Sequence, residues 1–134
     1  MEDTHQQEME LIKAANAVRK QAYAPYSQYA VGAALLTAGG NIFTGVNVEN
    51  ASYPLSMCAE RSALFSAVSA GERKFTTIAV VTRNGGSPCG ACRQVLSEFG
   101  LDIRVLVGNE DEEIIQDITV GELLPLSFGG KDLS

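Results

Sequence analysis

Two cysteines three residues apart, in the stretch "SPCGACRQ" from Ser87 to Gln94, are the first candidates for chemistry. A third cysteine, Cys58, begins the stretch "CAERSALF", and the chain contains three cysteines in all. Isolated cysteines are most often inert buried thiols, and a reducing cytosol disfavours disulfides. The close spacing of Cys89 and Cys92 instead favours a metal site, because thiolates are preferred ligands of zinc.

Three thiolates are one ligand short of a structural zinc site, which has a closed shell of four ligands. An open fourth position is typical of catalytic zinc, where the pKa of a bound water falls from about 16 towards neutrality. The single histidine, His5, could close the shell, but it lies in a polar N-terminal stretch that we expect to fray. The pattern therefore favours a site that activates water, with closure by His5 as the alternative.

A residue that could carry a proton is also present, because Glu60 follows Cys58 by two positions. A carboxylate there could reach a zinc-bound water without itself binding the metal. Taken alone, Glu60 is equally well explained as an acidic residue in a first helical turn, where the helix dipole favours negative charge. The catalytic interpretation is preferred because it accounts for Glu60 and the three cysteines together.

The elements that must position these residues alternate between helices and strands. Apolar residues from Gln6 to Tyr23 recur at spacings of three and four, which predicts an amphipathic helix. Gly and Asn between two apolar runs, at 31–37 and 41–50, predict a β-hairpin. The same reading predicts helices at 58–70 and 88–99, strands at 76–82 and 103–107, an edge strand at about 112–118 and a helical turn at about 121–128. This order indicates an α/β sandwich with a central mixed sheet.

Both cysteine stretches fall at the starts of predicted helices. Ser87 is a favourable N-cap residue, and Pro88 suits the first helical position, where its missing amide proton costs nothing. Cys89 is then expected in the first turn, with Cys92 on the same side one turn later. A helix N-terminus favours the thiolate, which is the form that binds metal.

Composition narrows the expected partners. The 134 residues are enough for one domain, predicted over residues 1–134, without disulfides. A formal net charge of −6 disfavours nucleic acid, so a small ligand with little charge is expected. No apolar run approaches the roughly 20 residues that span a bilayer, and the N-terminal stretch is unlike a targeting peptide. We therefore expect no membrane partner and a cytoplasmic location.

The stretches "CAE" and "PCGAC" together resemble the zinc signature of the cytidine and deoxycytidylate deaminase superfamily. The three-cysteine version is similar to the small cytidine deaminases that act on free nucleosides. The similarity extends through "YAPYSQYAVGAAL", "GVNVENASY", "CAERSALF", "PCGACRQVL" and "LLPLSF", nearly the whole chain. It implies a three-layer sandwich with helices on both sides of the mixed sheet. It also implies a pyrimidine-salvage hydrolase that converts cytidine and deoxycytidine to uridine and deoxyuridine with release of ammonia.

The resemblance assigns roles at the metal. Cys58, Cys89 and Cys92 would bind one zinc per chain, whose hydroxide attacks the ring carbon that bears the amino group. Glu60 would take the proton from water, protonate the ring nitrogen and help ammonia to leave. Arg61 and Gln94 would lie beside the sulfurs, where a guanidinium withdraws negative charge from a three-thiolate site. A solvated arginine on a helix is the alternative for Arg61.

Substrate-binding residues also follow from the resemblance. Asn47 and Glu49, in "NVEN", match a pair that binds the ribose, although a polar strand end is the alternative. Tyr29 stands where the family places an aromatic ring, often Phe, against the base. Ala59, Tyr53 and Phe128 complete the predicted set.

Small cytidine deaminases of this family are homotetramers whose sites are completed across interfaces, so the resemblance implies the same here. Phe128 would contribute its ring to the base pocket of a neighbouring chain, with Tyr53 near the intersubunit site. A plain hydrophobic anchor within its own chain is the alternative for Phe128.

Three other functions are compatible with such a zinc site. A polynucleotide cytosine deaminase would need a basic groove and aromatic platforms, which a chain with no Trp and net charge −6 does not indicate. A deaminase of a related nucleoside antibiotic would keep the zinc residues, but the intact "NVEN" favours ordinary nucleosides. A non-catalytic module stabilised by zinc predicts no turnover.

Overall fold

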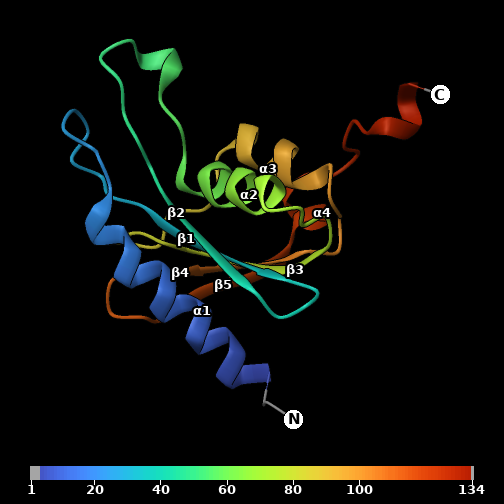
Figure 1. Ribbon diagram of the computed structural model, residues 1–134, viewed down its shortest axis with the longest axis horizontal. Coiled ribbons are helices and arrows are strands. Elements are labelled where there is room, and N and C mark those ends of the chain that lie inside the picture. The colour runs from blue at the N-terminus through green and yellow to red at the C-terminus, as the bar shows by residue number, and fades with distance from the viewer. Residues whose placement is uncertain (1–3, 134) are drawn as a thin grey trace.

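A five-stranded mixed sheet lies at the centre of the computed structural model, which describes residues 4–133 (Figure 1). The strand order is β2-β1-β3-β4-β5. β3 and β4 run parallel, and the other neighbouring pairs are antiparallel. The predicted hairpin, central strands and edge strand are therefore confirmed. Their bounds are Gly32–Thr37 for β1, Ile42–Val46 for β2, Phe75–Val81 for β3, Arg104–Gly108 for β4 and Ile114–Thr119 for β5.

Helices cover both faces of this sheet. α1 (Thr4–Val18) packs on one face, while α2 (Ala59–Ser69), α3 (Gly90–Ser97) and the short α4 (Val120–Leu123) lie on the other (Figure 1). The predicted three-layer α/β sandwich is thus confirmed.

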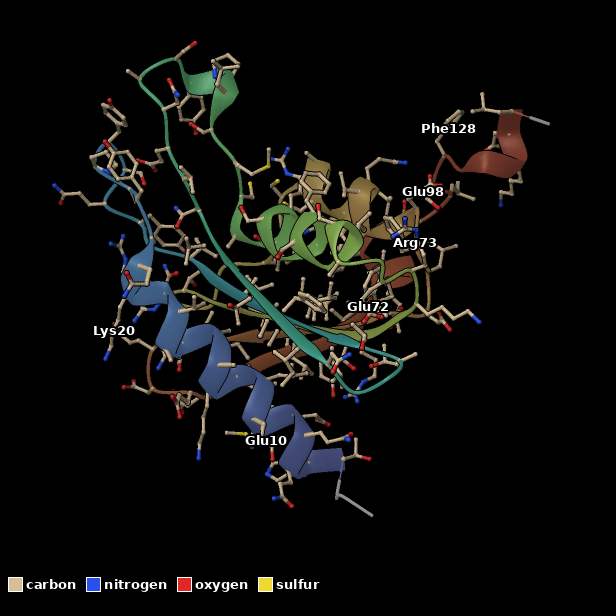
Figure 2. The ribbon with its side chains drawn as sticks, in the orientation of Figure 1. Glu10, Lys20, Glu72, Arg73, Glu98 and Phe128 are labelled. Atoms are coloured by element: carbon tan, nitrogen blue, oxygen red, sulfur yellow. The ribbon has the colours of Figure 1, made fainter. Side chains whose placement is uncertain are left out.

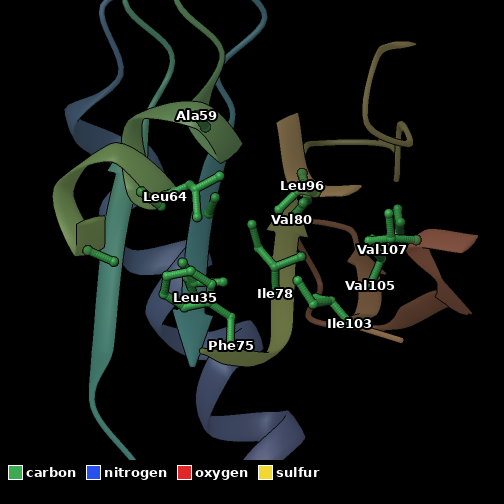
Figure 3. Packing of buried hydrophobic residues seen from close by; sticks show 14 residues of the cluster. Leu35, Ala59, Leu64, Phe75, Ile78, Val80, Leu96, Ile103, Val105 and Val107 are labelled. Atoms are coloured by element: carbon green, nitrogen blue, oxygen red, sulfur yellow. The ribbon is translucent and has the colours of Figure 1, made fainter. Parts of the chain in front are cut away.

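Alternation along the strands builds a core on each side of the sheet. In β1, Leu35 faces α2 and α3, whereas the adjacent Ala34 faces α1. In β3, Ile78 and Val80 join the core beneath α2 and α3, which Figure 3 shows from close by. Because both faces are covered, consecutive residues of these central strands are apolar.

A glycine in β2 lets α2 lie close to the sheet. A Cβ at Gly45 would lie 2.4 Å from the backbone nitrogen of Ala63 and 2.7 Å from the carbonyl oxygen of Ala59. Only a residue without a side chain fits there. The first turn of α2, which carries candidate site residues, is therefore seated directly on the backbone of β2.

Two helix boundaries differ from the sequence predictions. α1 ends at Val18 and is followed by a 3-10 turn, Arg19–Gln21, instead of continuing to residue 23. α3 begins at Gly90 with Cys89 as its N-cap, so Ser87 is not the cap and Pro88 precedes the helix. The side chain of Arg93 explains this, because it donates to the Pro88 carbonyl at 2.8 Å and to the Ser87 hydroxyl at 3.2 Å. These bonds hold both residues outside the helix.

The C-terminal segment stands away from the sandwich (Figure 1). α4 begins with a capping box between Thr119 and Glu122, and it ends after four residues. The predicted helical turn at 121–128 therefore exists only at its start, and a 3-10 turn, Gly130–Leu133, follows later. Within residues 4–133, no helix combines the length and apolar character that crossing a membrane requires.

Candidate active site

Three sulfur atoms meet where two helices begin. Cys58 is the N-cap residue of α2, Cys89 is the N-cap of α3, and Cys92 lies in the first turn of α3. The sulfurs of Cys58 and Cys89 are 3.8 Å apart, and those of Cys89 and Cys92 are 3.5 Å apart. All three lie within 4.8 Å of one another. The positive end of the α2 dipole favours the thiolate of Cys58. The pKa of Cys92 lies above its usual range, because its thiol donates to the Cys58 sulfur.

The spacing of the sulfurs fits zinc. A tetrahedral zinc with bonds of about 2.3 Å to sulfur holds its thiolates about 3.8 Å apart. The separations of 3.8 Å between Cys58 and Cys89 and 3.5 Å between Cys89 and Cys92 are close to that value. Three ligands leave one position of the tetrahedron open, as in catalytic zinc sites. His5 does not close it, because His5 is exposed in α1, across the sheet from α2 and α3.

Hydrogen bonds to its sulfur favour the charged form of Cys58. The Cys92 thiol is the main donor, and Arg61 adds a bond from Nη2 at 3.2 Å, so the pKa of Cys58 falls to about 5. The contact with this sulfur raises the pKa of Arg61 above its usual range. Within residues 4–133, Nε of Arg61 is buried with no hydrogen-bond partner. The guanidinium of the half-buried Arg61 thus contacts the sulfur cluster.

Glu60 is a buried carboxyl group next to the sulfurs. Its side chain is 5% exposed, and it lines the same cavity as Cys58 and Cys89. Burial raises the pKa of Glu60 to about 7, with a further contribution from the charge of Cys58. A group with a pKa near neutrality can both accept and release a proton, as general acid-base catalysis requires.

A cavity of about 560 Å³ opens above these groups. Its volume is in the range of small-molecule pockets, which is roughly 300–1,000 Å³. It is formed by the segments that follow α1 and β2 together with the first turn of α2 and the loop before α3. The predicted site residues among its lining are Tyr29, Asn47, Glu49, Tyr53, Cys58, Ala59, Glu60, Arg61 and Cys89.

Asn47 lies directly after β2 and binds the neighbouring loop. Its Oδ1 accepts from the backbone nitrogen of Val31 at 2.9 Å, and its Nδ2 donates to the carbonyl of Tyr29 at 2.9 Å. The amide therefore orients the segment that carries Tyr29, a structural role that was not predicted from the sequence.

Glu49 holds the same loop from a second point. Its carboxylate accepts from the backbone nitrogens of Tyr26 and Ser27, at 2.9 and 3.1 Å, and from the Ser27 hydroxyl. The Ser27 hydroxyl is the main reason that the pKa of Glu49 lies below its usual value. A fixed, ionised carboxylate is thereby presented at the cavity wall.

Gln94 and Phe128 lie together, outside the lining of the cavity. Nε2 of Gln94 donates to the carbonyl oxygen of Phe128 at 3.0 Å. The Phe128 ring is 57% exposed and belongs to the projecting C-terminal segment (Figure 2). The predicted place of Gln94 beside the sulfurs stays a prediction, as does the role of Phe128 in a neighbouring chain.

Arg93 is a site residue that was missed from the sequence. Besides the contacts with Ser87 and Pro88, its Nη1 donates to the carbonyl of Leu123 at 3.0 Å. Arg93 therefore connects the loop at Ser87 and Pro88, directly before Cys89, to the end of α4. The arginine directly after Cys92 was the available signal, but a charged residue on a helix is usually a solvated one.

Comparisons with known proteins agree with this site. Residues 5–109 match the family model described as the cytidine and deoxycytidylate deaminase zinc-binding region. A cytidine deaminase of Halalkalibacterium halodurans is 51% identical over 127 residues, covering 92% of this chain and 96% of that protein. A cytidine deaminase of Sporosarcina psychrophila is 47% identical over 126 residues, covering 92% and 93%.

Structural comparison gives the same result. The crystal structure of a cytidine deaminase from Burkholderia pseudomallei superposes with a TM-score of 0.87 at 48% identity, covering 95% of this chain and all of that one. The region matched by the family model contains all three cysteines of the cluster. The chain therefore belongs to the cytidine and deoxycytidylate deaminase family, whose matched region binds zinc.

Proposed function

We propose that the protein is a zinc-dependent cytidine deaminase that hydrolyses cytidine and deoxycytidine to uridine and deoxyuridine and releases ammonia. The observation that carries this proposal is the placement of a buried carboxyl group, Glu60, beside three sulfurs at one cavity. The names of the relatives support the same activity.

The cysteines, Glu60 and Arg61 have separate tasks in this reaction. Cys58, Cys89 and Cys92 would hold zinc, which when bound supplies a Lewis acid that activates water near neutral pH. Glu60 takes one proton from the attacking water and delivers it to the pyrimidine ring nitrogen. It then takes the second proton of that water, from the hydroxyl now on the ring carbon, and gives it to the amino group, which leaves as ammonia. Arg61, at 3.2 Å from the Cys58 sulfur, offsets part of the negative charge of three thiolates.

The opposite wall of the cavity suits a sugar. Asn47 and Glu49 offer an amide and a carboxylate for hydroxyl groups, and Tyr29 and Ala59 offer a ring and a small side chain for the base. A carboxylate accepts a hydrogen bond from a sugar hydroxyl but repels a phosphate. Together with the net charge of −6, this favours a free nucleoside over a nucleotide or a polynucleotide.

Assembly as a cytoplasmic homotetramer is part of the proposal. Tyr53 and Leu55, in the loop beside the cavity, are 77% and 70% exposed, and the exposed Phe128 ring is available to another chain. Large apolar side chains at such exposed positions are available for contacts between chains. Neighbouring chains would then exclude water from the base.

The test is to incubate the zinc-loaded protein with cytidine, deoxycytidine, adenosine, a cytosine-containing nucleoside antibiotic and a cytosine oligonucleotide, and to measure ammonia. Release from cytidine and deoxycytidine is expected, with none from adenosine. Turnover of the oligonucleotide or the antibiotic without turnover of the nucleosides would favour those alternatives. No turnover of any substrate would favour a binding module.

A further inference from the structure

Tyr29 makes a specific contact with the turn after β3. Its hydroxyl donates to Oδ1 of Asn84 at 2.6 Å, although the two residues are 55 positions apart in the chain. Tyr29 lines the cavity, and Thr82 and Gly86, on either side of Asn84, line it as well. The bond therefore joins two segments of the cavity wall, one after α1 and one after β3.

The turn is held in a fixed shape that presents Asn84. The buried hydroxyl of Thr82 accepts from the backbone nitrogens of Gly85 and Gly86, each at 2.8 Å, and it lies 3.4 Å from Oδ1 of Asn84. These bonds close the turn on itself. Asn84 thus needs little reorganisation to accept the hydrogen bond from the Tyr29 hydroxyl.

One more contact holds the same ring, and a glycine leaves room for its hydroxyl. The Arg83 guanidinium carbon is 5.1 Å from the centre of the Tyr29 ring, within the range of a cation-π contact. A Cβ added at Gly86 would lie 2.6 Å from the Tyr29 hydroxyl oxygen but 3.7 Å from Cζ of the ring. The turn therefore encloses the hydroxyl closely, and the absence of a side chain at Gly86 makes room for it.

We propose that Asn84 is a positioning residue for the nucleoside pocket: it secures the Tyr29 hydroxyl to the turn at residues 82–86, so that the ring forms a fixed wall for the pyrimidine. Because the hydroxyl donates its hydrogen bond to Asn84, it does not donate to the base, and Tyr29 presents only its apolar ring to the pyrimidine. This inference rests on the proposed function.

The first experiment measures kcat and KM for cytidine in Asn84→Ala. We expect KM to rise about fivefold, the size of one hydrogen bond, with kcat changed less than about twofold, because the wall binds substrate and transition state alike. Asn84→Asp keeps an oxygen acceptor and should restore a KM near wild type. Asn41→Ala, in the exposed turn between β1 and β2, is the matched control and should leave both constants unchanged.

A double-mutant cycle separates this role from a general structural one. In Tyr29→Phe the bond is absent, so adding Asn84→Ala should not raise KM further. Likewise, Gly86→Ala should raise KM in the wild-type background and much less with Tyr29→Phe, since the crowded atom is the hydroxyl oxygen. An Asn84→Ala effect that is equally large in the wild-type and Tyr29→Phe backgrounds, or an unchanged KM in Asn84→Ala, would overturn the proposal.

Failure of the proposed function gives a different result. If the wild type does not turn over cytidine, the proposed function is wrong. The affinity for uridine is then measured by calorimetry in the same set of variants, in place of KM. Coupling between positions 29 and 84 in that affinity would still support the positioning role. Absence of uridine binding, or binding without coupling, would overturn it.

Discussion

At the scale of single residues, the proposed function assigns metal binding and proton transfer to different side chains. The sulfurs of Cys58, Cys89 and Cys92 form the cluster, whereas Glu60 shares the cavity and is not part of the three-residue metal-binding group. Substitution of a cysteine should therefore lower the zinc content, whereas substitution of Glu60 should lower the rate and leave the zinc content unchanged.

Replacing Cys89 or Cys92 with Ala should abolish both zinc binding and deamination. Two thiolates retain too few ligands for a catalytic zinc, which normally has three from the protein. The measurement is zinc per chain by elemental analysis after dialysis, with about one equivalent expected in the wild type. Wild-type zinc content in either variant would contradict the ligand assignment.

Glu60→Gln should keep zinc and lose activity. The amide has nearly the same shape as the buried carboxyl group, but it cannot accept and return a proton. A loss in kcat of about 10² to 10⁴ is expected for a general acid-base group. Its zinc content is the internal control, since a variant that lost its metal would be slow for another reason. Full activity in the zinc-loaded variant would exclude Glu60 from the mechanism.

Among the elements, the contact of β2 with α2 determines where the metal end of the site lies. α2 begins at the Cys58 cap and is seated on β2 at Gly45, and Asn47 and Glu49 follow two and four residues later. Moving α2 away from β2 would therefore separate Cys58 and Glu60 from Asn47 and Glu49, the residues proposed to bind the sugar.

Gly45→Ala should destabilise the protein by about 1–3 kcal/mol, the usual cost of forcing extra volume into a packed contact. The added Cβ would lie 2.4 Å from the Ala63 backbone nitrogen, and a helix backbone cannot move aside as a side chain can. Urea unfolding measures the effect. Gly39→Ala is the control, because its Cβ would have only the Thr37 hydroxyl nearby, at 3.8 Å. Equal stability of the two variants would show that α2 shifts without cost.

At the scale of the whole molecule, the exposed ring of Phe128 is the feature on which the proposed assembly can be tested. Phe128 is held on its segment by the bond from Gln94 to its carbonyl oxygen, yet its ring packs outside the cavity of its own chain. In the proposed tetramer, this ring would enter the site of another copy.

We expect a tetramer by analytical ultracentrifugation, and Phe128→Ala should weaken nucleoside turnover while leaving zinc content unchanged. Leu133→Ala, also exposed near the end of the chain, is the control. Mixing inactive Glu60→Ala chains with chains that end before Phe128 should restore some activity, because one chain can combine its intact centre with a neighbour's ring. A fully active monomer would contradict this assembly without affecting the zinc chemistry.

Much of the site could be predicted from the sequence, because its chemistry resides in residue types at short spacing. Cys58 and Glu60 are two positions apart and Cys89 and Cys92 are three, so each pair is local and its ligand or proton chemistry follows from composition and helix geometry. The central strands β1, β3 and β4 were predictable for a related reason, since burial on both faces demands the apolar runs that the sequence contains.

The tertiary structure decided what depends on residues far apart in the chain. The start of α3 at Gly90 follows from contacts of Arg93 that no local propensity encodes, and the seating of α2 depends on Gly45 opposite Ala63. The bond between Tyr29 and Asn84 spans 55 positions and exists only because β3 ends beside the loop after α1. Local sequence specifies which groups can react, whereas packing over long separations determines which groups hold them in place.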